Sequence, residues 1–201
     1  MLLGHMEHKK DENFPDFYLK WPKLKEYIPT EPGIMIVDFG CGIGEILKEI
    51  KLINPNSNCI GLDVSKEGLK KARNKLPNLD FKKIEDGHSV PIESNSVDFV
   101  FSSEVMEHIY DTESAFQEIS RILKVGGRFL MTVPYHGFLK NLLITLFAFD
   151  KHFDPAGPHI RFFSKMTLHN ELKKVGLKIL YNGYYGRFWP ISHSIYVLAE
   201  K

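Results

Sequence analysis

The sequence predicts a doubly wound α/β fold, in which helices cover both faces of a mostly parallel β-sheet. Apolar runs typical of strands alternate with helical patterns along the chain, which indicates successive βαβ units. These runs are apolar throughout, as expected for strands buried on both faces. Two later aromatic runs are joined by a short connection that permits an antiparallel hairpin. We therefore expect a seven-stranded sheet whose last strand or two run antiparallel.

The composition is that of one folded domain. The chain has 201 residues, of which 43% are hydrophobic and 12% aromatic, enough for a full core. Lys and Arg number 26 against 25 Asp and Glu, so the net charge of +1 gives no sign of a nucleic-acid partner. The two cysteines, Cys41 and Cys59, make neither a metal cluster nor a disulfide framework, which favours the reducing cytoplasm. No apolar run approaches the ~20 residues of a membrane span.

The main domain is expected over residues 31–201, after an N-terminal segment of 30 residues. Gly4-His5-Met6 is typical of a tag remnant, and a helical extension is expected to follow it. Five parallel strands are predicted at residues 34–39, 59–62, 79–84, 97–102 and 128–133. Helices are predicted between them near residues 43–53, 66–76 and 112–123. The third helix carries an apolar stripe and is expected to end at Gly126-Gly127.

The regular alternation stops after the fifth strand, where residues 138–160 form an insertion. Its first part, residues 138–149, is apolar nearly all round, which predicts burial on more than one side. Three interpretations stay open: packing against the domain or a second subunit of a homodimer, a lid over an apolar ligand, and an interfacial membrane contact. A helix opened by Ser164 and two strands at 177–185 and 194–199 complete the fold.

A glycine-rich turn follows the first strand. Gly40, Gly42 and Gly44 lie where the strand ends and a helix begins, so the backbone can turn sharply and a ligand can approach the helix N-terminus. Asp63 ends the second strand, 23 positions after Gly40, where a carboxylate can accept both hydroxyls of a ribose. A dinucleotide fingerprint would place its third glycine at position 45, which is Glu45. This departure disfavours a nicotinamide-dependent dehydrogenase.

Five motifs in order resemble those of the class I S-adenosylmethionine-dependent methyltransferases, particularly the small-molecule, type 11-like group. They are residues 37–45, 61–65, 85–100, 103–109 and 122–127, and residues 159–164 resemble the element before the last helix in many relatives. The resemblance is good over residues 34–133 and looser beyond. It implies a Rossmann-like fold, S-adenosyl-L-methionine as the cofactor, and transfer of its methyl group to an acceptor.

The resemblance also implies which residues bind the cofactor. They are Asp38, Gly40, Gly42, Gly44, Asp63, Val64, Asp86, Gly87, Ser103 and Glu104. The glycines would pass the methionine portion, with Asp38 near its ammonium. Asp63 would hold the ribose, Val64 and residues 86–87 would contact the adenine, and Glu104 would lie near the methyl-bearing end.

The charge pattern fits this cofactor and bears on the acceptor. Residues 85–113 contain eight acids and no Lys or Arg, which suits a molecule carrying a sulfonium and an ammonium. The seven basic residues of 66–83 are predicted to form a solvated helix face on the adenosine side. An acidic rim would repel a polyanion, so a nucleic-acid acceptor is disfavoured. A small or lipid-like acceptor is expected instead.

Candidate catalytic residues follow the fourth and fifth strands. Methyl transfer depends on positioning and desolvation, and a base is needed only when the acceptor holds its proton at neutral pH. His108 lies just past the fourth strand, and Tyr135 and His136 follow the fifth. His152 and His159 lie in the insertion and could shape a lid. Each of these side chains could instead serve in packing.

A possible metal pattern includes the same region. Glu104, Glu107 and His108 at positions i, i+3 and i+4 of one helical turn could bind a divalent ion if another His or Asp joined them. The pattern resembles that of small-RNA 3′-end methyltransferases and ubiquinone-pathway O-methyltransferases. Because no downstream histidine has a clear spacing, the expected site contains no metal.

The function expected from these observations is methyl transfer from S-adenosylmethionine to a small or lipid-like acceptor. Two alternatives stay open. One is a metal-assisted RNA or quinone-precursor methyltransferase. The other is a non-catalytic S-adenosylmethionine-binding partner subunit.

Overall fold

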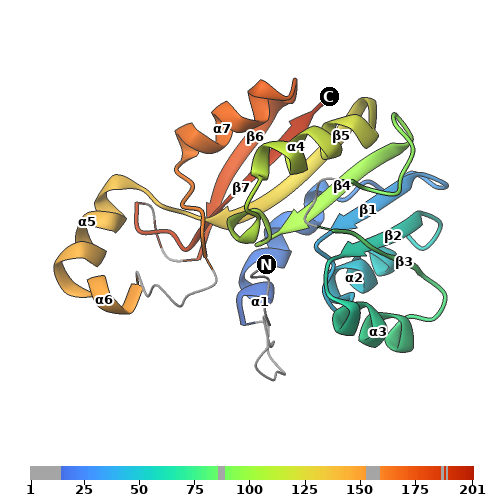
Figure 1. Ribbon diagram of the computed structural model, residues 1–201, viewed down its shortest axis with the longest axis horizontal. Coiled ribbons are helices and arrows are strands. Elements are labelled where there is room, and N and C mark those ends of the chain that lie inside the picture. Colours follow the sequence, from blue (N-terminus) through green and yellow to red (C-terminus); the bar gives the residue numbers. More distant parts are fainter. Residues whose placement is uncertain (1–14, 86–88, 153–158, 187, 189) are drawn as a thin grey trace.

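The computed structural model describes residues 15–85, 89–152, 159–186, 188 and 190–201, and its centre is a seven-stranded sheet (Figure 1). The strands are β1 (Met35–Phe39), β2 (Asn58–Asp63), β3 (Asp80–Lys83), β4 (Val97–Ser103), β5 (Leu123–Pro134), β6 (Lys178–Tyr185) and β7 (Ser194–Glu200). The helices are α1 (Pro15–Leu24), η1 (Lys25–Tyr27), α2 (Glu45–Ile53), α3 (Lys66–Lys75), η2 (Met106–His108), α4 (Thr112–Ile122), α5 (Phe138–Phe147), α6 (Phe149–His152) and α7 (Lys165–Lys174). The predicted fold class is confirmed.

The sheet has the strand order β3-β2-β1-β4-β5-β7-β6. Strands β1 to β5 pair in parallel, and β7 runs antiparallel to both β5 and β6. The chain runs outward from β1 to β3 and then returns to lay β4 on the other side of β1. The segments after β1 and β4 therefore diverge at the carboxyl edge, and such a switch point is where open α/β sheets bind ligands.

Two layers of helices cover the sheet. Helices α4 and α7 lie on one face, and α1, α2 and α3 lie on the other (Figure 1). Strand β1 serves both layers, because Ile36 packs with α2 and α3 while Val37 packs with α4. Helix α1 joins the second layer through Leu24, which is fully buried, and through Trp21, whose ring packs edge-on against Phe101. Residues 1–14, which include the predicted tag remnant, lie outside the described residues.

Six strands begin and end within one residue of their predicted positions, and β5 is the exception. The prediction ended α4 at Gly126-Gly127 and began the strand at residue 128. In the structure α4 ends at Ile122 and β5 begins at Leu123, which pairs with Val97. Gly126 has a φ of 79° and donates its N–H to the carbonyl of Lys201. The glycines therefore bend an early part of the strand, and the apolar stripe of α4 ends one residue sooner than predicted.

The apolar segment after β5 forms α5, and the prediction that it packs against the domain is wrong, whereas packing against a second subunit stays a prediction. No residue of α5 is buried, and Phe138 and Phe147 are 85% and 81% exposed. The helix extends beyond the end of the sheet together with α6 (left in Figure 1), so no core element in the described part of the chain covers it. No helix among the described residues is long and apolar enough to cross a membrane.

Candidate active site

The glycine turn after β1 is a tight backbone structure. Gly40, Gly42 and Gly44 have φ values of 82°, 52° and 83°, a region that residues with a Cβ seldom adopt. A Cβ at Gly40 would lie 2.3 Å from Cγ2 of Val105, which follows β4. Gly44 is the N-cap of α2, so the turn opens directly onto the N-terminus of that helix. The turn thus leaves backbone, rather than side chains, at the switch point of the sheet.

Asp63 holds this turn in place from the neighbouring strand. Its Oδ2 accepts a hydrogen bond from the backbone N–H of Gly42 at 2.7 Å, and its Oδ1 accepts from the N–H of Ser65 at 2.8 Å. A carboxylate has about four acceptor positions, so each oxygen keeps one for a ligand. Val64, the next residue, is exposed beside it. The structure therefore brings together the glycine turn and the spaced acid, as the sequence predicted.

Asp38 lies behind the turn as a buried carboxyl group. It is 1% exposed, and its Oδ2 has no hydrogen-bond partner among the described residues. Burial, reinforced by the charge of Asp63, raises the pKa of Asp38 to about 8, against a smaller lowering by Lys20. A cation near this carboxyl would stabilise its charged form. The group is thus suited to meet a positive charge at the end of β1.

The end of β4 carries a hydrogen-bond network that sequence reasoning missed in part. Lys20 of α1 donates from Nζ to Oγ of Ser103, and Oε1 of Glu104 accepts from Thr132 Oγ1 at 2.7 Å and from the Tyr185 hydroxyl at 2.6 Å. Burial and Glu104 raise the pKa of Tyr185, which keeps its hydroxyl protonated as a donor. Lys20 and Tyr185 lie 83 and 81 positions from their partners, so no local motif could have indicated them.

The predicted placement of Glu104, Glu107 and His108 on one helical turn is wrong. Glu104 has a left-handed φ of 55°, and helix η2 begins only at Met106 as a single 3₁₀ turn. Glu104 therefore takes part in the hydroxyl network with Thr132 and Tyr185. Glu107 is fully buried and takes no part in that network, and neither of its carboxylate oxygens is hydrogen-bonded to a described residue. Burial, with the charge of Glu104, raises the pKa of Glu107 to about 8.

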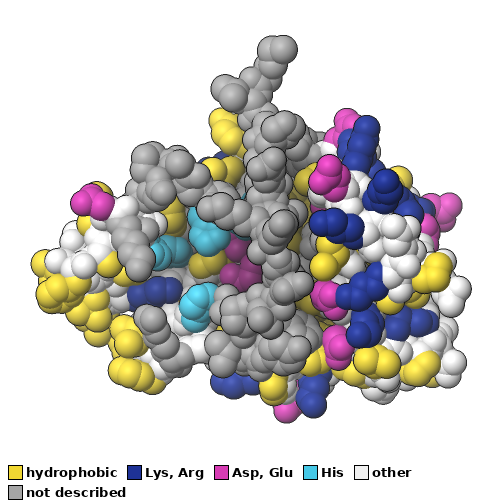
Figure 2. All heavy atoms as spheres, turned by 90° about the horizontal axis from the view of Figure 1, so that it is seen from below, with side chains coloured by type: hydrophobic (Ala, Val, Ile, Leu, Met, Phe, Trp, Pro, Cys, Tyr) yellow, Lys and Arg dark blue, Asp and Glu magenta, His cyan; other side chains and the backbone are white. Residues whose placement is uncertain are grey.

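Histidines from four segments gather at the carboxyl edge. The rings of His108 and His159 lie 5.0 Å apart, and those of His136 and His152 lie 5.5 Å apart, between centroids. His136 Nδ1 lies 3.2 Å from Oδ1 of Asn141, and burial lowers the pKa of His136 to about 4. Its ring is therefore neutral at pH 7. Figure 2 shows histidine side chains around an acidic patch in a hollow of this face, between an apolar side and a Lys/Arg-rich side.

The remaining predicted residues have different surroundings. Tyr135 lies in the core cluster, with its ring 4.9 Å from that of Tyr184, and its backbone N–H donates to the carbonyl of His193. Asp86 and Gly87, expected beside the adenine, lie outside the described residues. The basic side chains of α3 are exposed, as predicted for a solvated face.

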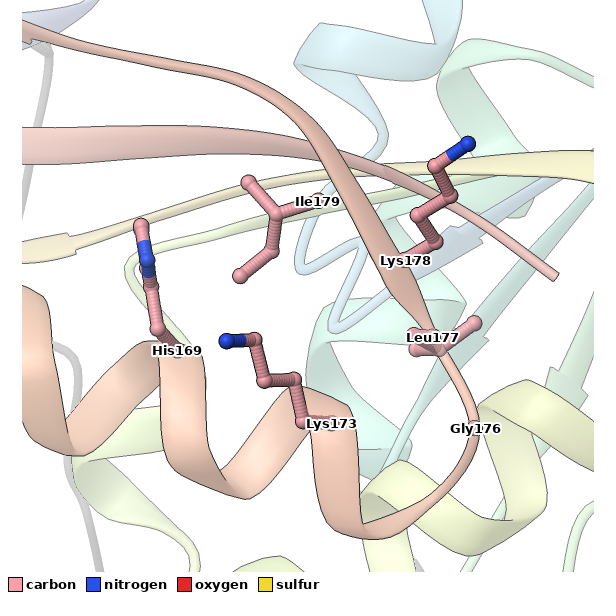
Figure 3. Close-up of a pocket in the computed structure, with 6 residues that line it drawn as sticks. All are labelled: His169, Lys173, Gly176, Leu177, Lys178 and Ile179. Atoms are coloured by element: carbon pink, nitrogen blue, oxygen red, sulfur yellow. The ribbon is translucent and has the colours of Figure 1, made fainter.

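Two open grooves accompany this arrangement. One lies between α7 and β6 and is lined by His169, Lys173, Gly176, Leu177, Lys178 and Ile179 (Figure 3). Lys178, the first residue of β6, pairs with Glu200 of β7, and Glu200 pairs in turn with Arg128 in the early part of β5. This groove is therefore at the edge of the sheet opposite the glycine turn. The other groove lies between the start of α4 and α7, where Thr112, Arg161 and Thr167 are among the residues that line it. None of the predicted site residues lines this second groove.

Comparisons with known proteins point to one class of domain. A family model described as a methyltransferase domain matches residues 37–131. The chain is 36% identical over 120 residues to a tRNA (carboxymethyluridine(34)-5-O)-methyltransferase of Schizosaccharomyces pombe, covering 58% of this chain and 49% of that protein. It is 28% identical over 146 residues to a demethylmenaquinone methyltransferase of Symbiobacterium thermophilum, covering 68% of this chain and 58% of that protein.

A solved structure shows the same fold. The S-adenosylmethionine-dependent methyltransferase from Mesorhizobium loti superposes with a TM-score of 0.72 at 19% sequence identity, covering 90% of this chain and 97% of that one. At this identity the likeness concerns the fold alone. The chain spans 33%, 36% and 49% of the length of three curated relatives.

Proposed function

Because residues 37–131 of this chain belong to the methyltransferase-domain family, we propose that the protein transfers a methyl group from S-adenosylmethionine to an acceptor. The observation that carries the proposal is the glycine turn fastened to Asp63 at the switch point of the sheet. The cofactor, when bound, supplies a methyl group on a positively charged sulfur. The residues of this chain have to bind, orient and desolvate it.

The residues at the edge fit such a cofactor. Asp38 offers a buried carboxylate oxygen that has no hydrogen-bond partner among the described residues, and pairing with the ammonium would offset the cost of its burial. Asp63 keeps acceptor positions for ribose hydroxyls, and the exposed side chain of Val64 would lie against the adenine. Ser103 and Glu104, at the end of β4, would lie towards the methyl-bearing end. Asp86 and Gly87 are proposed for the adenine on the resemblance alone.

For the acceptor, we propose a small or lipid-like molecule. Helix α5 exposes large apolar side chains and is connected to the site, because Asn141 of α5 and His152 of α6 both contact His136. These side chains would exclude water from an apolar acceptor and hold it beside the edge. His108, Tyr135 and His136 remain the proposed acceptor-facing residues. The low pKa of His136 makes it a weak base, so we assign proton transfer, where the acceptor requires it, to His108.

An RNA acceptor is the second candidate, favoured by the 36% identity to a tRNA methyltransferase. The half-buried acid Glu104, at the end of β4, argues against a polyanion at this place. A panel of radiolabelled methyl-transfer assays with tRNA, quinone precursors and fatty-acid-like acceptors would separate the two candidates. Methylation of tRNA alone would refute the small-molecule proposal.

Calorimetry tests the cofactor directly. We expect S-adenosylhomocysteine to bind the full chain and NADH not to bind. Binding of NADH in its place would overturn the proposal. Binding of S-adenosylhomocysteine without turnover of any acceptor would instead favour the non-catalytic partner subunit.

A further inference from the structure

We propose that Glu107, His108 and His159 form a binding site for one divalent transition-metal ion, beside the carboxyl end of β4. One carboxylate oxygen of Glu107 and one ring nitrogen from each histidine lie within 4.8 Å of one another. Oε1 of Glu107 and Nε2 of His108 are 3.9 Å apart. Ligands around a tetrahedral zinc ion at ~2.1 Å are about 3.4 Å apart. Small rotations of these side chains would therefore bring the three atoms onto one ion.

The carboxylate of Glu107 is the observation that points to a ligand. Its side chain is fully buried, and neither oxygen accepts a hydrogen bond from any described residue. A buried carboxylate without partners is unfavourable, because desolvation removes water without replacing its hydrogen bonds. Lys20 lies on the same side, but its Nζ donates to Ser103. A cation between Glu107 and the two imidazoles would supply the missing partner.

The backbone holds the two halves of the proposed site together. The carbonyl oxygen of Glu107 accepts hydrogen bonds from the N–H groups of Ile160 (3.0 Å) and Arg161 (3.1 Å). These bonds fasten η2 to the segment that carries His159. The Arg161 guanidinium also donates to the Tyr110 carbonyl and lies 5.5 Å from the centre of the Tyr110 ring. The ligand-bearing segments are therefore held side by side by bonds that do not involve the proposed ligand atoms, which is the preorganisation a metal site needs.

The set of donors favours particular ions. Two imidazoles and one carboxylate suit Zn²⁺, Co²⁺, Fe²⁺ or Mn²⁺, whereas Mg²⁺ and Ca²⁺ prefer oxygen ligands throughout. Glu104 is not counted as a ligand, because its Oε1 already accepts from Thr132 and Tyr185. The sequence favoured a site without metal because no downstream histidine had a clear spacing. The fold brings up His159, which lies 51 positions after His108.

Three protein ligands leave open positions on an ion of this kind. An oxygen atom of the acceptor could occupy one of them, and the ion would lower the pKa of a hydroxyl bound to it. With an ion bound, this lowering takes the place of the proton-accepting role proposed for His108, because the ring nitrogen of His108 would then be a ligand. This consequence depends on the proposed function. The metal site itself does not, since its occupancy can be measured without methyl transfer.

The test uses Co²⁺ as the probe, because its visible absorption reports the ligands around it. The full chain is stripped of metal and titrated with Co²⁺, and Zn²⁺ is then added as a competitor. We expect one equivalent of Co²⁺ to bind and Zn²⁺ to displace it, while Mg²⁺ and Ca²⁺ leave the spectrum unchanged. Glu107→Gln and His159→Ala should each weaken Co²⁺ binding at least tenfold.

Two control variants keep the result specific. His169→Ala removes a histidine of α7 at the opposite edge, and a variant carrying His5→Ala and His8→Ala removes those of the N-terminal segment. Both should bind Co²⁺ like the unaltered chain. The proposal is wrong if the unaltered chain binds no Co²⁺, if the Glu107 and His159 variants bind it equally well, or if only the N-terminal variant loses it. The affinity for S-adenosylhomocysteine is measured on the same samples. A variant that keeps this affinity is folded, so a loss of Co²⁺ binding in that variant concerns the metal site and not the proposed function.

Discussion

Replacing Gly40 by alanine tests the backbone turn on which the proposed cofactor site depends. The substitution has two costs, because Gly40 has a φ of 82° and an added Cβ would lie 2.3 Å and 2.8 Å from the two γ-carbons of Val105. A left-handed conformation costs a residue with a Cβ ~1–2 kcal/mol. Overpacking of this kind adds about 1–3 kcal/mol. We therefore expect Gly40→Ala to lower the free energy of unfolding by about 2–5 kcal/mol.

The chain offers a matched control for the first cost. Gly33 has nearly the same φ, 78°, but a Cβ there would meet no atom within 4 Å. Gly33→Ala should therefore cost only the ~1–2 kcal/mol of the backbone conformation. The difference between the two variants isolates the contact with Val105.

A double-mutant cycle tests the same contact from its other side. Val105→Ala shortens the side chain that the new Cβ would meet, so in that background Gly40→Ala should cost about 1–3 kcal/mol less. The assay is urea unfolding followed by far-UV circular dichroism, with the free energy extrapolated to water. Equal costs for Gly33→Ala and Gly40→Ala, or additive effects of Gly40→Ala and Val105→Ala, would refute the reasoning.

Three further predictions concern the site. Asp63→Ala should weaken S-adenosylhomocysteine binding about ten- to a hundredfold, since a hydrogen bond to a charged group contributes ~1.5–3 kcal/mol; Asp80→Ala, an exposed acid at the start of β3, should leave the affinity unchanged in calorimetry. Replacing residues 138–149 by a short Gly/Ser link should leave that affinity within a few fold and abolish transfer to the true acceptor, and a loss of cofactor binding would contradict this. Asp38→Asn should stabilise the protein more at pH 8 than at pH 5. The Asp38 carboxyl has a pKa of 3.8 in the unfolded chain and of about 8 in the folded protein, so the unaltered protein loses stability as the pH rises between these two values. An equal gain at both pH values in urea unfolding would show that Asp38 is charged in the folded state.

The fold and the glycine turn could be predicted because they depend on neighbours in sequence. Apolar runs mark β1 to β4 within one residue, and the turn, the end of β2 and Asp63 follow one another in a fixed order. The burial of α5 against the domain was mispredicted, since an apolar composition does not reveal whether another element of the chain covers it. The helical placement of Glu104 with Glu107 failed because Glu104 itself is left-handed, and such a conformation has no clear signal in a glutamate.

The rest of the site depends on contacts between distant segments. Lys20 reaches Ser103, and the carbonyl of Glu107 binds the segment next to His159. Such pairs are fixed by how the helices and strands pack in three dimensions. A single sequence carries no local pattern for them, so the histidine cluster became visible only in the structure.

The place of β7 in the sheet has a consequence for motion. Among the described strands, β6 pairs with β7 alone, so these two strands form a hairpin that can open as one cooperative unit. The hairpin carries Tyr185, which donates to Glu104, and Ser194, whose hydroxyl lies 3.5 Å from the same carboxylate. Each opening would release Glu104 from these hydroxyls. The exchange rate of the amide hydrogens along β6 and β7 would therefore report how often Glu104 is held by Thr132 of β5 without the hydroxyls of the hairpin.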